Sequence, residues 1–157
     1  MNKILFYPAL VCLLTLAACS KSKKSGVKQE NKNEVVSQEI TDKKWKLIEL
    51  SGKAVADSVN GKEPFLLLQK ADDRYTAGGG CNGLGGTFEL LANGKIKFTQ
   101  GMSTMMACED MWVETDLNQA LVQADNYTVN GDNLSLNKAK MAPLARFRAV
   151  GSGIEKK

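Results

Sequence analysis

The sequence contains no histidine. Histidine is the commonest general base and the commonest metal ligand, so its absence weakens the case for an enzyme or a metal centre. Beyond the first 18 residues, no apolar run is long enough to cross a bilayer. Basic and aromatic residues do not alternate anywhere, which disfavours nucleic-acid binding although the net charge is +4. We therefore expect a protein that is not an enzyme and that uses no cofactor, metal or nucleic acid.

Residues 1–18 have the order of a secretory signal. Lys3 precedes the apolar segment 4–16, and small residues follow immediately before Cys19. This order is typical of bacterial lipoproteins and predicts cleavage before Cys19, whose thiol would carry the lipid. A helix over 4–16 would reach only about 20 Å, short of the roughly 30 Å hydrocarbon core. We expect a lipid-anchored envelope protein. Ser20 after the cysteine favours sorting to the outer membrane but does not indicate the face, and we take the periplasmic face as the expected location.

The remaining chain divides into a tether, one domain and a short tail. Residues 19–42 are rich in Lys, Ser, Asn, Gln and Glu, a composition that predicts a flexible tether. Residues 43–150 carry strand-like alternation and form the expected folded domain, and residues 151–157 form a disordered tail. The predicted fold class is α+β and mainly antiparallel β. We expect about seven or eight strands in a curved or partly closed sheet, with one helix packed against it.

Hydrophobic periodicity places these elements. Val113, Leu117 and Leu121 recur at helical spacing and predict a helix over 110–123. Asn93-Gly94 between two alternating segments predicts a tight hairpin turn. The candidate strands lie at 45–50, 65–69, 74–77, 87–91, 95–99, 127–129, 134–136 and 144–150.

Two cysteine-containing segments carry the most specific pattern. They are Gly80-Cys81-Asn82-Gly83 and Thr104-Met105-Met106-Ala107-Cys108, preceded by Trp45-Lys46-Leu47 and followed by Glu114. In this order they resemble the META domain family, also called HslJ-like, over about 110 residues. The resemblance implies a compact β-rich fold with a helix, an envelope or secreted location and a link to stress tolerance in bacteria. It implies no agreed catalytic activity.

Cys81 and Cys108 are the two cysteines that remain after the signal and the lipidation site. Outside the cytoplasm disulfides persist, and two cysteines allow one pairing. A Cys81–Cys108 bond would close a loop of about 28 residues and stabilise the fold by about 3–4 kcal/mol. Two buried free thiols, or a redox or metal role, are the alternatives, although no CxxC spacing supports the latter.

The binding candidates surround these cysteines. Asn82 is expected to hydrogen-bond backbone groups in its turn. Met105 and Met106 belong to a cluster with Met102 and Met111, which we interpret as core filling. An adaptable apolar binding surface or a soft copper(I) site is the alternative. Trp112 lies one residue off the apolar helix face, so it either caps the core or is exposed as a contact anchor.

Three functions follow. The preferred hypothesis is a membrane-anchored, non-enzymatic envelope lipoprotein that binds an envelope protein or a lipidic ligand, or supports the envelope under stress. The second is a carrier of a small hydrophobic molecule inside the sheet. The third is a thiol-active or metal-handling protein. The carrier requires a continuous cavity with an apolar lining, from residues such as Phe65, Leu67, Phe88, Phe98 and Leu121.

Overall fold

The structure is a computed structural model that describes residues 40–151. The predicted signal, the lipidation site Cys19 and most of the tether lie outside the described residues, as do residues 152–157. Within residues 40–151, no helix combines the length and the apolar character that crossing a membrane requires.

The described residues form ten strands, one α-helix and one 3-10 turn. The strands are β1 (Lys44–Leu50), β2 (Lys53–Ala54), β3 (Phe65–Gln69), β4 (Arg74–Gly78), β5 (Gly83–Leu91), β6 (Lys95–Phe98), β7 (Met102–Ser103), β8 (Asn126–Asn130), β9 (Asn133–Asn137) and β10 (Ala145–Ala149). The helix is α2 (Trp112–Gln123), and the turn is η1 (Ala92–Gly94).

Eight strands close into a barrel in the order β1-β3-β4-β5-β6-β8-β9-β10. Every neighbouring pair is antiparallel, and β10 returns to β1 over a register that runs from Trp45↔Ala149 to Leu50↔Ala145. The predicted main element types are confirmed, but the sheet is more closed than the curved or partly closed sheet expected. The pairing of the first strand with the last is a long-range register, and local periodicity carries no signal for it.

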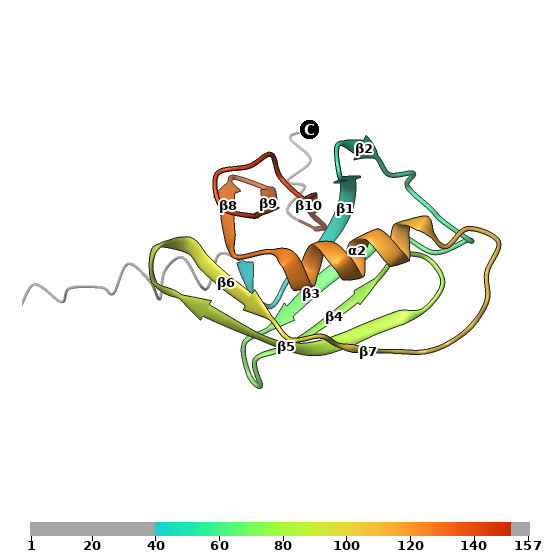
Figure 1. Ribbon diagram of the computed structural model, residues 1–157, viewed down its shortest axis with the longest axis horizontal. Coiled ribbons are helices and arrows are strands. Elements are labelled where there is room, and N and C mark those ends of the chain that lie inside the picture. The colour runs from blue at the N-terminus through green and yellow to red at the C-terminus, as the bar shows by residue number, and fades with distance from the viewer. Residues whose placement is uncertain (1–39, 152–157) are drawn as a thin grey trace, which may run out of the picture.

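The barrel has one weak seam, between β6 and β8. These strands pair only at Lys95↔Asn126. Among the described residues, the rest of this edge of β6 has no strand partner, and α2 packs against β6 and β1 instead. Figure 1 shows α2 running between β8–β10 on one side and β3–β7 on the other. The helix thus completes the wall that the strands leave unfinished.

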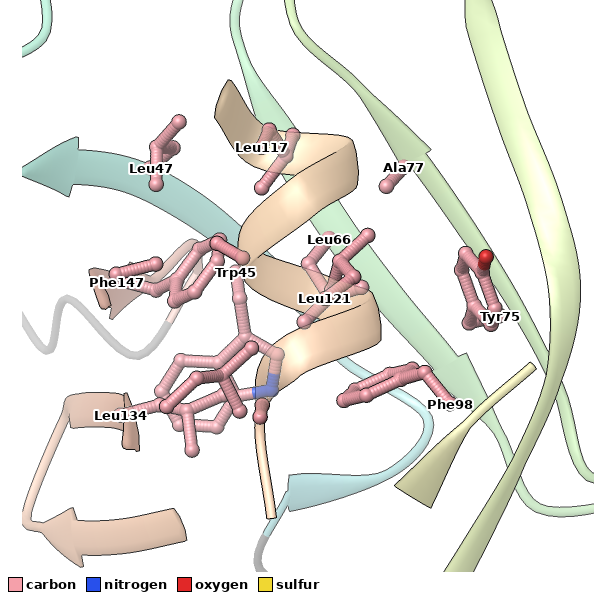
Figure 2. Packing of buried hydrophobic residues seen from close by; sticks show 14 of the residues in the cluster. Trp45, Leu47, Leu66, Tyr75, Ala77, Phe98, Leu117, Leu121, Leu134 and Phe147 are labelled. Atoms are coloured by element: carbon pink, nitrogen blue, oxygen red, sulfur yellow. The ribbon is translucent and has the colours of Figure 1, made fainter. Parts of the chain in front are cut away.

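The core lies between this helix and the inward faces of the strands. Leu117 and Leu121 project from α2 among side chains of both halves of the barrel, and both are fully buried (Figure 2). The cluster includes Trp45, whose indole N–H donates to Ile40 O at 2.8 Å. The other fully buried large side chains among the described residues are Ile40, Tyr75, Phe147, Leu47, Leu50, Leu66, Leu68, Ile96 and Leu134.

Glycine permits a left-handed turn at one position of the sheet and a close contact with an aromatic ring at another. Asn93 and Gly94 have φ of 62° and 69°, so the predicted hairpin turn is confirmed in the left-handed region that this pair favours. Gly86 faces Tyr75 across the β4–β5 pair, and a Cβ there would lie 2.8 Å from the Tyr75 ring. The ring therefore occupies space that a larger residue at position 86 would need.

The helix begins at Trp112, two residues later than the predicted start at 110. Asp110 lies outside it and accepts the Trp112 backbone N–H at Oδ1, 3.2 Å away. Asp110 is also tied to Asn60, whose Nδ2 donates to the Asp110 carbonyl at 2.6 Å. These bonds hold the chain before the helix in a turn.

Shortening a side chain on the buried face of the helix should destabilise the barrel strongly. Leu117→Ala removes a fully buried side chain between the two halves of the core, and we expect a loss of about 3 kcal/mol in the free energy of unfolding. Val122→Ala in the same helix is the control, because Val122 is 46% exposed and should change stability by less than about 0.5 kcal/mol. Urea denaturation measures both, and equal losses would contradict this packing.

Candidate functional site

The side chain of Asn82 joins three segments that are distant in the sequence. Its Nδ2 donates to Glu114 Oε1 at 2.9 Å and to the Met106 carbonyl at 3.0 Å. Its Oδ1 accepts the Thr104 hydroxyl and the Met106 backbone N–H, both at 2.8 Å. The Asn82 backbone N–H donates to Glu114 Oε2 at 2.6 Å. We call these four residues the Asn82 clamp.

The clamp is a buried, charge-assisted arrangement. Asn82 is 4% exposed and Glu114 is 7% exposed. Both carboxylate oxygens of Glu114 are occupied by N–H groups of one residue, and hydrogen bonds to an ionised acceptor are the stronger kind. Glu114 also lies in the first turn of α2, where negative charge is favourable to the helix dipole. Removing either partner would leave the other buried and unsatisfied, which costs several kcal/mol.

The glycines before Asn82 allow this close approach. A Cβ on Gly79 would collide with the backbone of Glu114, so only glycine lets the chain reach the start of α2. Gly80 has φ of 111°, and a Cβ there would lie 2.5 Å from Val59 O. The backbone therefore packs closely against neighbouring segments at both positions.

Cys81 and Cys108 form the expected disulfide, with Cα atoms 6.0 Å apart. Cys81 is 2% exposed, and its carbonyl accepts Lys62 Nζ at 2.9 Å. We call residues 102–108 the methionine segment. The disulfide fixes Cys108, at the end of this segment, to Cys81, the residue that precedes Asn82. A thiol-active role would need free, accessible thiols, and the structure instead has both sulfurs in a disulfide.

The methionines do not fill the core, so this interpretation is wrong for three of the four. Met105 is 98% exposed, Met102 81% and Met106 52%, whereas Met111 is partly buried. The reason is the clamp, which uses the backbone of Met106 and the hydroxyl of Thr104. Because the backbone is turned inward onto Asn82, the side chains are turned outward.

A groove lies between this segment and α2. Its volume is about 540 Å³, and a second hollow of about 270 Å³ adjoins it through Thr115 and Asn118. The groove is lined by Asn82, Leu84, Ser103, Thr104, Met105, Met106, Ala107, Met111, Glu114, Thr115 and Asn118. The second hollow adds Gln100, Gln119, Val122 and Gln123.

The groove carries almost no charge. Glu114 is its one ionisable lining residue, and the Asn82 clamp engages both oxygens of that carboxylate. The second hollow is lined by uncharged residues throughout. Asn118 lines both spaces, and its Oδ1 is buried without a hydrogen-bond partner in the described part of the chain. Residues 40–151 contain no cluster of three or more His, Cys, Asp or Glu side chains that could hold a metal ion.

The remaining predicted site residues lie apart from the groove. Trp112 is half-buried against the core, and Lys53 Nζ lies 5.8 Å from the centroid of its ring. Trp112 does not line the groove. Sequence reasoning connected Glu114 only with the family pattern and did not pair it with Asn82.

The side chains proposed for a carrier cavity do not share one face. Phe88, Phe98 and Leu121 are buried in the core, as expected. Phe65 and Leu67 are only partly buried, because Leu66 and Leu68 take the inward positions of β3. The alternation of the strand therefore places Phe65 and Leu67 on the outer face of the barrel, and the expected continuous lining is not formed.

The chain is similar to one protein family in sequence and to several solved structures in fold. The model of the META domain family matches residues 38–151. The chain is similar in fold to an NMR structure of a protein from Burkholderia xenovorans, with 22% identity and a TM-score of 0.59 over 74% of this chain and 88% of that one. It is also similar to a DUF4847 family protein from Bacteroides vulgatus, with 16% identity and a TM-score of 0.51 over 72% and 96%. No curated protein matches the chain.

Exchanging the amide and the carboxylate of the clamp tests its geometry. Asn82→Asp sets a second carboxylate against Glu114, and we expect a loss of about 3 kcal/mol in the free energy of unfolding. Glu114→Gln removes the buried charge and should also destabilise. The double variant restores an amide-to-carboxylate pair in the opposite direction. It should therefore lose less than the sum of the single variants by about 1 kcal/mol or more, as measured by urea denaturation, and additive losses would contradict the pairing.

Removing the disulfide should weaken the domain without abolishing the clamp. Replacing both Cys81 and Cys108 by alanine should lower the free energy of unfolding by about 3 kcal/mol. The Asn82 bonds to Met106 do not depend on the sulfurs. In NMR spectra of the variant, the Met106 amide should therefore stay protected from hydrogen exchange relative to the exposed amides of neighbouring loops. An unprotected Met106 amide in a folded variant would show that the disulfide alone holds the segment.

Proposed function

Because this chain belongs to the META domain family, we propose that it is a lipid-anchored, non-enzymatic binding module of the bacterial envelope. The observation that carries the proposal is a backbone segment, restrained by hydrogen bonds and a disulfide, that presents exposed apolar side chains. Met105 and Met106 lie beside a groove of about 540 Å³, on a segment held by the Asn82 clamp and ended by the disulfide.

The exposure of these methionines argues for contact with a partner. Large apolar side chains gathered at a groove mark interaction sites more often than single exposed ones do. Methionine is unbranched and polarisable, so it adapts to partners of different shape. The segment is also pre-ordered, which lowers the entropy cost of binding. These properties fit a surface that binds an envelope protein or a lipidic ligand.

The chemical groups at the site support binding over catalysis. The carboxylate of Glu114 is engaged by two N–H groups, and the two cysteine sulfurs are bonded to each other. Each of these groups therefore has a structural partner already. A nucleophile or general base needs a group that is free to react with a substrate.

The anchor rests on the sequence around Cys19. The order of charge, apolar segment and small residues before Cys19 is that of a lipoprotein signal. Attached acyl chains would hold the protein on a bilayer, with residues 20–42 between the lipid and the barrel. The proposed location is the outer membrane, with the domain in the periplasm, where a role under envelope stress fits the family.

Cys19→Ala should separate the domain from the membrane. We expect the wild-type chain to sediment with membranes and to incorporate radiolabelled palmitate, and we expect the variant to do neither. The folded domain should be unchanged in both, as judged by the near-ultraviolet circular dichroism of its tryptophans. A variant that still sediments with membranes, or a wild-type chain that takes up no label, would contradict the anchor.

Photo-crosslinking in cells tests the binding surface. A photoreactive amino acid at position 105 should give a discrete crosslinked product, because Met105 is 98% exposed at the groove. The matched control is position 141, where Met141 is 67% exposed and lies outside the groove lining. We expect no discrete product there. Equal crosslinking at both positions, or none at either, would contradict a binding role for the groove.

A further inference from the structure

We propose that the groove binds an extended, uncharged segment of a polypeptide, which adds as an outer strand beside β7. This inference rests on the proposed binding function and names the class of partner and the way it docks. It is carried by a free strand edge, a helix that forms the opposite wall and the near absence of charge among the described lining residues.

The free edge belongs to β7. This strand pairs with β5 at Leu84↔Ser103 and Gly85↔Met102, and within residues 40–151 no strand pairs with its other side. Thr104 donates its backbone N–H to Gly83 O, towards β5, at 3.3 Å. Backbone groups of successive residues in an antiparallel strand point to opposite edges. The N–H and C=O of Ser103 therefore face away from β5, into the groove that Ser103 lines.

A helix forms the opposite wall. Thr115, Asn118, Gln119 and Val122 follow the helical spacing along one side of α2 and line the groove or the second hollow. An exposed strand edge with a helix opposite is the arrangement in which peptide-recognition domains bind a peptide as an added strand. Main-chain hydrogen bonds then supply affinity, and alternate side chains enter the groove.

The edge is held ready for pairing. The Tyr75 hydroxyl donates to Thr99 O at 3.1 Å, and a Cβ on Gly101 would collide with the same hydroxyl, so the chain packs closely on Tyr75 just before β7. Burial raises the pKa of the Tyr75 phenol, so it stays protonated and able to donate. The Asn82 clamp holds the chain just after β7. A strand fixed at both ends loses little entropy when a partner strand pairs with it.

The walls select an uncharged occupant. The groove and the hollow present amides, hydroxyls and methionines, with Glu114 engaged by Asn82. A charged side chain placed there would lose hydration without gaining an opposite charge. A fatty acid offers an apolar chain and a single carboxylate, and it has no row of N–H and C=O groups for Ser103.

The test uses the full chain, purified from membranes in dodecyl maltoside, and a phage library of random twelve-residue peptides. We expect enriched peptides without charged residues and with apolar residues at alternate positions. In a synthetic copy of the best peptide, N-methylation of alternate amides should weaken binding at least tenfold, and methylation of the intervening amides less than twofold. No enrichment, charged sequences or no alternation would overturn the inference.

Three variants locate the binding. Ser103→Pro removes the outward N–H but leaves the Thr104–Gly83 bond, and it should weaken binding at least tenfold. Met105→Glu should also weaken it tenfold, whereas the matched Met141→Glu, outside the groove, should not change it. Unchanged thermal midpoints would show that the variants are folded. If Ser103→Pro misfolds, slowed hydrogen exchange of the Ser103 amide on adding peptide replaces it. An exchange rate that peptide does not change would overturn the inference.

Competition with palmitate distinguishes a lipidic occupant of the groove from a peptide. If palmitate slows hydrogen exchange in the groove and no peptide binds, the inference fails. A lipid crosslinked at position 105 would then still support the proposed binding function. If peptide binds and palmitate does not compete with it, the inference stands. If position 105 gives no crosslink in cells and no peptide is enriched, the inference and the proposed function both fail.

Discussion

The hydrogen bonds between Asn82 and Glu114 are the constraint on which the rest of the site depends. The carboxylate is anchored in the first turn of α2, and the amide stands at the start of β5, so the pair fixes the helix to the barrel at one point. The other half of the same amide holds the backbone of Met106. One buried side chain therefore decides both where the helix begins to pack and which way the methionine segment faces.

The clamp and the disulfide restrain the same segment by different physics. The Cys81–Cys108 bond limits the unfolded chain and acts on stability whatever the local geometry. The clamp acts in the folded state, because its hydrogen bonds require fixed positions of three segments. The disulfide brings the ends together, and the clamp sets the orientation of the residues between them. With the disulfide but without the clamp, the direction of the Met105 side chain would not be fixed.

Local patterns predicted most of the barrel strands, but they could not predict contacts between segments that are distant in the sequence. The short apolar run at Phe65–Gln69 and the Asn93-Gly94 turn were enough to place β3 and the β5–β6 hairpin. In β1, strict alternation from Trp45 and Leu47 would turn Glu49 inward, but an irregular register between Leu47 and Glu49 makes Leu50 the buried residue instead. β7 has two residues, too few to show a period. The clamp partners are 32 residues apart, and hydrophobic periodicity says nothing about polar pairs.

The groove is a consequence of how the barrel closes. β6 and β8 share one residue pair, so closure leaves an open edge that a sheet must cover or protect. The helix covers the edge along β6, where its apolar face is needed for the core. It does not pair with β7, because a helix has no free backbone groups along its side. The uncovered part of the edge therefore lies beside the clamp, with the exposed methionines at its rim. The stability of the core and the availability of a binding edge thus follow from the same incomplete pairing.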